Sequence, residues 1–262
     1  MKEIYYIYSA NILSKMYHLV YPFSFFGNIV GFRDVDTGLR LNDAAKQLEA
    51  TDGKFLDVGA GGLSPFTFLG CNVLSFDIRR QAGINLVGSV THLPFRDDSF
   101  DVVFSLDTIE HVPRAQRVSA LKEMIRVAKE KVIIHTPLEN GVNFLGRQHD
   151  LAFNEWFEGH TGVPNIISSE HISNIEPSPA ELQDLGFSIN GTRNAKLWFK
   201  FMRFQYLPNF KLKYSLNPLH VVEMVGWLFF TWIFYFFHRH EDKKPPFWGG
   251  ICTLHKRVEF GF

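Results

Sequence analysis

Five short apolar runs, separated by helix-like segments, constrain the fold of this chain more than any other feature. The runs are rich in Val, Ile, Leu or Phe: Lys54–Val58, Val73–Asp77, Ile84–Val87, Phe100–Ser105 and Lys131–Thr136. Strands that are apolar on both faces and alternate with helices form parallel sheets covered on both sides. Residues 52–137 therefore predict a doubly wound α/β sheet.

One helix is predicted inside this region, and a long irregular segment follows it. Arg117–Lys129 carries its apolar side chains at helical spacing. Leu138–Glu176 is rich in Asn, Gly and His and predicts a loop longer than an ordinary connection. Its part Gly141–Glu176, with Trp156, Phe157, Glu158 and His160, is the predicted acceptor-binding lid.

Capping residues predict a further helix after this loop. Ser178 suits the N-cap, Pro179 and Glu181 suit the first turn, and Gly186 suits the stop. The last two strands are predicted at Phe187–Gly191 and Trp248–Lys256.

The turn after the first strand carries the clearest chemical signal. Gly59, Ala60 and Gly61 form a glycine turn in which the main chain bends sharply and a ligand can approach it closely. Asp77 ends the next strand, where a carboxylate can hydrogen-bond a ribose diol. Together these residues predict a nucleotide site.

The residues beside the turn indicate which nucleotide binds. A dinucleotide fingerprint has a third glycine where this chain has Ser64, and a carboxylate at Asp57 would repel a pyrophosphate. Asp57 suits the ammonium and sulfonium charges of S-adenosylmethionine. An NAD-dependent oxidoreductase and a non-catalytic, membrane-associated nucleotide-binding protein remain the alternatives.

Several segments in a fixed order resemble the class I S-adenosylmethionine-dependent methyltransferases, of the small-molecule type with an LPF element. They are FLDVGAGG, SFDIR, GSVTHLPFRDDSFDVVFSLDTIEHV, RVAKEKVIIHTP and PSPAELQDLGFSI. The resemblance covers residues 52–189 and the last strand. It implies a Rossmann-like, seven-stranded sheet, mostly parallel with an antiparallel last strand, and S-adenosylmethionine as cofactor.

The resemblance also implies site residues. The family usually has Asp where this chain has Ser89, so Ser89 and the backbone of Val90 are expected to contact adenine. The cofactor-binding residues implied in this way are Asp57, Gly59, Ala60, Gly61, Asp77, Ser89, Val90 and Leu106.

Two histidines are candidate general bases for a hydroxyl acceptor. His111 follows the fourth strand, near Asp107 and Glu110, where the family places substrate or cofactor contacts, and His171 lies in the long loop. His111 is alternatively a cap of the next helix against Pro113. No metal site is predicted, because no pair among His135, His149, Asp150, His160 and His171 has convincing ligand spacing.

Composition limits the partners. Lys plus Arg equals Asp plus Glu, 27 each, so the chain lacks the basic excess of a nucleic-acid-binding protein. Cys71 and Cys252 are too few for a disulfide framework and suit a reducing compartment. We therefore expect a cytoplasmic protein with no nucleic-acid partner; its oligomeric state stays open.

An apolar segment, Val221–Phe237, points to a lipid surface. It is followed by basic residues and is too short to cross a bilayer, so it predicts an interfacial helix at the cytoplasmic membrane face. Tyr17–Phe32 can extend the same surface; the alternatives are a cap over the site or a dimer contact. The expected acceptor is small or lipid-linked, and methylated at oxygen.

These features divide the chain into four parts. Residues 1–50 are the predicted helical, aromatic cap and residues 51–200 the methyltransferase core. Residues 201–246 form the predicted apolar helical insertion, and residues 247–262 contain the last core strand.

Overall fold

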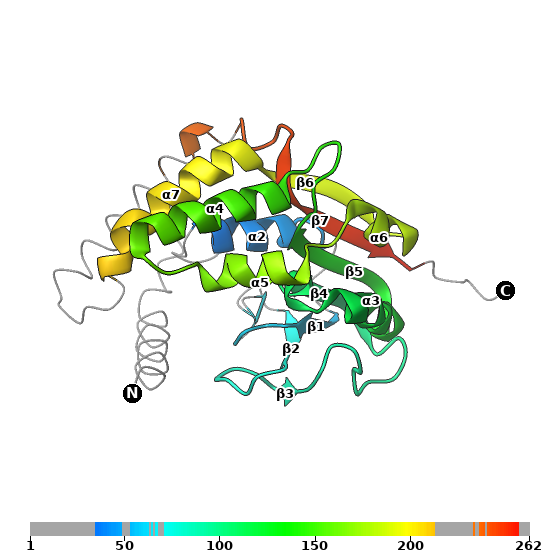
Figure 1. Ribbon diagram of the computed structural model, residues 1–262. Coiled ribbons are helices and arrows are strands. Elements are labelled where there is room, and N and C mark those ends of the chain that lie inside the picture. The colour runs from blue at the N-terminus through cyan, green and yellow to red at the C-terminus, as the bar shows by residue number, and fades with distance from the viewer. Residues whose placement is uncertain are drawn as a thin grey trace.

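A seven-stranded sheet with helices on both faces forms the centre of the computed structural model (Figure 1). The strands lie in the order β3-β2-β1-β4-β5-β7-β6. β7 is antiparallel to both of its neighbours, β5 and β6, and the other neighbouring strands are parallel. The predicted sheet is therefore confirmed, including its antiparallel last strand.

The structure describes residues 35–48, 53–62, 64, 66–67, 71–212, 233, 236–238 and 240–256, and the statements below concern these residues. The strands are β1 (Lys54–Val58), β2 (Asn72–Asp77), β3 (Leu86–Val87), β4 (Phe100–Leu106), β5 (Ala128–Pro137), β6 (Ser188–Asn194) and β7 (Phe247–His255). The helices are α2 (Val35–Ala45), the 3-10 helix η2 (Ile109–His111), α3 (Arg114–Val127), α4 (Gly146–Thr161), α5 (Ile166–Asn174), α6 (Pro179–Asp184) and α7 (Ala195–Leu212).

Alternating side chains along the strands build one core on each face of the sheet. Leu56 and Val103 point to the face covered by α3 and α6. Their chain neighbours Phe55 and Phe104 point to the opposite face, which α2 covers. A fully buried Leu, Val or Phe side chain stabilises the fold by about 1.5–3 kcal/mol. This two-sided burial explains why the strands are apolar almost without interruption.

The prediction of a loop over Leu138–Glu176 is wrong, because most of this segment is helical. α4 and α5 lie side by side there, and α4 also packs against α7 (Figure 1). The buried stripe of α4 includes His149 and Asp150 beside Phe153 and Phe157. Polar residues inside the buried stripe hide the hydrophobic periodicity that identifies a helix. The acceptor-binding lid predicted over Gly141–Glu176 is therefore not an irregular loop.

Other boundaries differ by a few residues. α3 begins at Arg114, before the predicted start, and the chain enters β5 at Ala128, where a helix was predicted. The capping prediction for α6 is confirmed: Ser178 accepts a hydrogen bond from the Glu181 N–H, and the Glu181 side chain accepts one from the Ser178 N–H.

Two predicted parts of the chain are only partly described. Within residues 1–50, α2 packs on the sheet, and α7 runs through the boundary predicted between residues 200 and 201. Tyr17–Phe32 lies outside the described residues, as does most of Val221–Phe237. Among the helices that are described, none is both long and apolar enough to cross a membrane.

Candidate active site

The glycine turn follows β1 at the carboxyl ends of the parallel strands. Gly59 has φ +76°, and a Cβ there would lie 2.2 Å from the Thr108 side chain, so only glycine fits. The N–H groups of Gly59 and Ala60 both donate to the Phe76 carbonyl. Gly61 has φ +61°, and no atom lies within 4 Å of where its Cβ would be. Hydrogen bonds to Phe76 and the close contact with Thr108 therefore fix the turn at Gly59, whereas the space beside Gly61 is open. A ligand can approach the backbone there.

Asp77, the predicted ribose ligand, also organises the turn. Its carboxylate accepts hydrogen bonds from the Gly61 N–H at 2.9 Å and from the Arg79 N–H at 2.8 Å. Asp77 is 8% exposed and ends β2 directly beside the glycine turn. Each carboxylate oxygen has a second lone pair for a hydroxyl group. The predicted ribose contact thus fits a side chain whose first role is structural.

Asp57 lies in β1, just before the turn, and is buried. Burial raises the pKa of Asp57 to about 7; the nearby Ser64 side chain lowers the pKa only in part, and the charge of Asp77 adds to the rise. A carboxyl group of this kind becomes fully ionised when a cation binds beside it. The predicted contact with the ammonium group of S-adenosylmethionine fits this environment.

The remaining predicted cofactor residues lie at the same edge of the sheet. Ser89 follows β3, and its hydroxyl pairs with that of Thr91 at 2.8 Å. Val90 is partly buried against the core cluster on one face of the sheet, and Leu106 is the last residue of β4. Adenine recognition by these residues stays a prediction.

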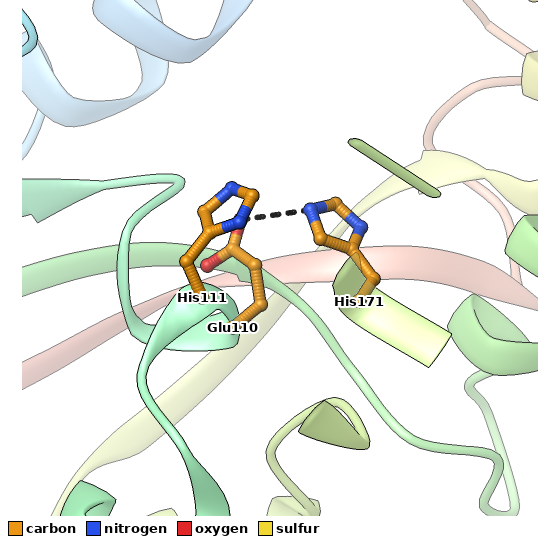
Figure 2. Close-up of side chains that lie close together, drawn as sticks. All are labelled: Glu110, His111 and His171. Carbon is orange, nitrogen blue, oxygen red and sulfur yellow. Dashed lines mark ion pairs between the residues drawn. The ribbon is translucent and has the colours of Figure 1, made fainter. Parts of the chain in front are cut away.

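The two candidate bases lie in one cluster, although they are far apart in the sequence. The rings of His111, from η2, and His171, from α5, have centroids 4.8 Å apart. Glu110 completes the group, with its Oε1 3.9 Å from Nε2 of His171 (Figure 2). His111 pairs through Nδ1 with Glu170 and does not cap α3, which begins without a side-chain cap. The capping alternative for His111 is therefore wrong.

Asp150, which the sequence did not identify as a positioning residue, orients His171. The Nδ1 of His171 donates to Asp150 at 2.7 Å, and His149 and the Trp248 indole N–H donate to the same carboxylate. Burial favours the neutral carboxyl, but the hydrogen bonds from His149 and His171 hold the pKa of Asp150 below its usual range. Burial lowers the pKa of His171, yet the hydrogen bond to Asp150 and the charge of Glu110 raise it overall.

A buried arginine joins α5 to η2. Arg117 of α3 donates to the carbonyls of Ile109 and Val112 on one side and to those of Asn174 and Ile175 on the other. It therefore holds the end of the helix carrying His171 against the helix carrying Glu110 and His111. No local sequence pattern indicates this role, because Arg117 occupies a buried position of α3 where hydrophobic periodicity expects an apolar residue.

Asp107 belongs to a second polar chain at the end of β4. Its carboxylate pairs with Arg40 of α2 and accepts from Nδ1 of His135, whose Nε2 meets the Thr192 hydroxyl. Asp107 has φ +51°. The predicted contact of Asp107 with substrate or cofactor thus competes with an ion pair inside the protein.

The two halves of the site meet at Thr108. Its hydroxyl donates to the Gly59 carbonyl at 3.2 Å, and η2, with Glu110 and His111, begins at the next residue. The glycine turn and the histidine cluster are therefore connected directly across the ends of β1 and β4.

Comparisons with known proteins show which proteins this chain resembles. Residues 56–135 match the family model described as a methyltransferase domain. A protein of Encephalitozoon cuniculi, provisionally named a methyltransferase, is 47% identical over 62 residues, which are 23% of this chain and 30% of that protein. The matched part thus spans less than a third of this relative.

The fold also resembles a crystal structure from Anabaena variabilis. That protein is a provisionally assigned methyltransferase of an antibiotic biosynthesis pathway, with 14% identity, a TM-score of 0.51, and coverage of 86% of this chain and 99% of the other. This similarity supports the fold alone. Residues 56–135 therefore carry a methyltransferase domain, and the sheet around them has the fold of this neighbour.

Proposed function

We propose that this protein methylates an oxygen atom of a small or lipid-linked acceptor. The observation that carries the proposal is the contact between Thr108 and Gly59, which sets the histidine cluster beside the cofactor turn. S-adenosylmethionine supplies the methyl group. The acceptor oxygen forms a bond to the methyl carbon while the bond between that carbon and the sulfur breaks. The electrons of the broken bond stay on sulfur, and the hydroxyl proton of the acceptor is released.

The chain's own residues orient the reactants and handle that proton. Gly59, Gly61 and Asp77 hold the nucleotide end of the cofactor, and Asp57 holds its ammonium group. A nucleophile aligned about 3 Å from the methyl carbon reacts without further rearrangement. The rings of His111 and His171 lie in the cluster that Thr108 joins to the glycine turn, and a hydroxyl acceptor there needs a base or a pKa-lowering partner.

The first test is binding. Calorimetry on the purified protein should show S-adenosylhomocysteine binding and no NAD binding. NAD binding without S-adenosylhomocysteine binding would favour the oxidoreductase alternative, and binding of neither would favour a non-catalytic protein. Incubation with methyl-labelled cofactor and lipid extracts should then label a lipid fraction; label only in water-soluble molecules or protein would contradict a lipid-linked acceptor.

Exposed apolar residues support a lipid-linked acceptor met at a membrane surface. Ile233, Phe236 and Phe237 are exposed, and Lys243 and Lys244 lie nearby in sequence. Exposed apolar area costs roughly 25 cal/mol per Å² relative to burial, and basic residues attract anionic headgroups. Replacing the three apolar residues with Ser should reduce sedimentation with anionic liposomes.

A matched control separates this effect from a general change in hydrophobicity. Val142 is fully exposed elsewhere on the surface, so Val142→Ser should leave liposome binding unchanged. If the unaltered protein does not sediment with liposomes, these side chains do not serve membrane contact.

A further inference from the structure

We infer that Glu110, His111 and His171 form a binding site for a divalent transition-metal ion, which binds and activates the acceptor oxygen. One potential ligand atom from each residue lies within 4.8 Å of the other two (Figure 2). Two imidazoles and one carboxylate are a common protein ligand set for such ions and leave coordination positions open.

Two buried atoms of the cluster lack a partner within the described part of the chain. Glu110 Oε1 and His171 Nε2 make no hydrogen bond there, although Glu110 is fully buried and His171 is 5% exposed. They face each other at 3.9 Å, which is too long for a hydrogen bond. Buried polar atoms without partners cost free energy, and both atoms are lone-pair donors when the histidine is neutral. A cation between them removes this cost.

One atom of each of the three side chains is held by a hydrogen bond, as in many metal sites. The Nδ1 of His171 pairs with Asp150, and Nδ1 of His111 pairs with Glu170 at 2.9 Å. Glu110 Oε2 accepts from the Thr136 hydroxyl at 3.0 Å. Histidines that bind metals usually donate their other N–H to a carboxylate or carbonyl, which orients the ring. Each of the three candidate ligands thus has an orienting partner and a second atom that can bind an ion.

The three ligand atoms must move slightly closer together when an ion binds. Metal bonds of about 2.0–2.2 Å place two ligand atoms within about 4.4 Å of each other. The pair formed by Glu110 and His171 already meets this limit. His111 is the most exposed of the three, with 32% of its side chain accessible, and it lies in the short helix η2, so it can move toward the ion.

A bound ion changes the role of the two predicted bases. His111 and His171 become ligands, and the acceptor hydroxyl binds an open coordination position, where the cation lowers its pKa. The hydroxyl proton then leaves to solvent, and the oxygen takes the methyl group as described above. This role rests on the proposed function, whereas binding of the ion does not.

The test uses the full chain and Zn²⁺ as the probe. After removal of metal with a chelator, the protein should bind one equivalent of Zn²⁺, measured by calorimetry and by metal analysis after desalting. Glu110→Gln and His171→Gln should each weaken Zn²⁺ binding at least tenfold. His255→Ala is the matched control, because it removes an exposed histidine at the end of β7 and should leave binding unchanged.

Binding of S-adenosylhomocysteine shows in the same samples that each variant is folded. If a Glu110 or His171 variant fails this control, His111→Gln, at the more exposed position, replaces it. The inference is overturned if the folded wild-type protein binds no Zn²⁺, or if the folded variants bind Zn²⁺ as tightly as the wild type does. Zn²⁺ binding without any methyl transfer would instead leave the metal site standing and contradict the proposed function.

Discussion

The glycine turn and the histidine cluster are adjacent in space but are encoded in different ways. Asp57, Gly59 and Gly61 come from one short stretch, and Asp77 ends the neighbouring strand. The cluster instead joins η2 to α5, and it depends on α4 and α3 for Asp150 and Arg117. The first region can be recognised from local sequence, whereas the second exists only once the fold is complete. Substitutions should therefore separate cofactor binding from methyl transfer.

The largest effect is expected at Gly59. Gly59→Ala places a Cβ 2.2 Å from Thr108 in a left-handed conformation, so the turn must shift. Affinity for S-adenosylhomocysteine should fall at least 100-fold in calorimetry. Gly61→Ala is the comparison, because its Cβ meets no atom within 4 Å and only the backbone strain remains. Equal losses in the two variants would show that the contact with Thr108 does not matter.

The same contrast explains what the sequence predicted. The strands and the glycine turn follow from local patterns, and the structure confirms them. α4 and α5 were missed because His149, Asp150 and His171 occupy buried positions where a helix normally has apolar residues. His111 and His171 were each identified as candidates, but their proximity depends on hydrogen bonds from Arg117, which no local pattern indicates.

Asp150→Asn should affect the second region alone. An amide can present its NH₂ group to His171 and so disturb the ring's protonation and orientation. Replacing such an orienting carboxylate typically costs 10–100-fold in activity. Methyl transfer should fall by this factor while S-adenosylhomocysteine affinity stays within threefold. Glu155→Gln, on the exposed side of α4, is the control and should change neither quantity. A parallel loss of cofactor affinity would contradict the separation of the two regions.

Asp77→Asn should weaken cofactor binding by about tenfold or more, because hydrogen bonds to a charged acceptor contribute about 1.5–3 kcal/mol. The structure adds an expected loss of thermal stability, since the carboxylate also holds the N–H groups of Gly61 and Arg79. Calorimetry and a thermal melt measure the two effects. An unchanged dissociation constant would place the ribose elsewhere.

A smaller effect is expected from pH. The pKa of Asp57 is raised to about 7 in the free protein, so its carboxylate is mostly neutral at pH 6 and mostly ionised at pH 8. Affinity for S-adenosylhomocysteine should rise about tenfold between these values, because only the ionised form attracts the ammonium group. Asp57→Asn should remove this dependence. A wild-type affinity that does not change with pH would contradict the assigned contact.

The raised pKa of Asp57 also predicts how the free energy of unfolding changes with pH. Because folding raises the pKa of this carboxyl, the folded state binds more protons than the unfolded state between about pH 4 and pH 7. The contribution of Asp57 to stability should therefore fall as pH rises through this range. Urea unfolding of the free protein should show Asp57→Asn gaining stability relative to wild type toward pH 8.

The most direct measurement compares cofactor affinity and methyl transfer in one preparation of Glu110→Gln. Glu110 lies in the histidine cluster, where its carboxylate faces His171 and accepts from the Thr136 hydroxyl, and glutamine keeps the shape of the side chain. Calorimetry should give an S-adenosylhomocysteine affinity within threefold of wild type, while transfer from methyl-labelled cofactor to the acceptor fraction falls at least 100-fold. Unchanged transfer, or equal loss of affinity and transfer, would contradict a site built from two separable regions.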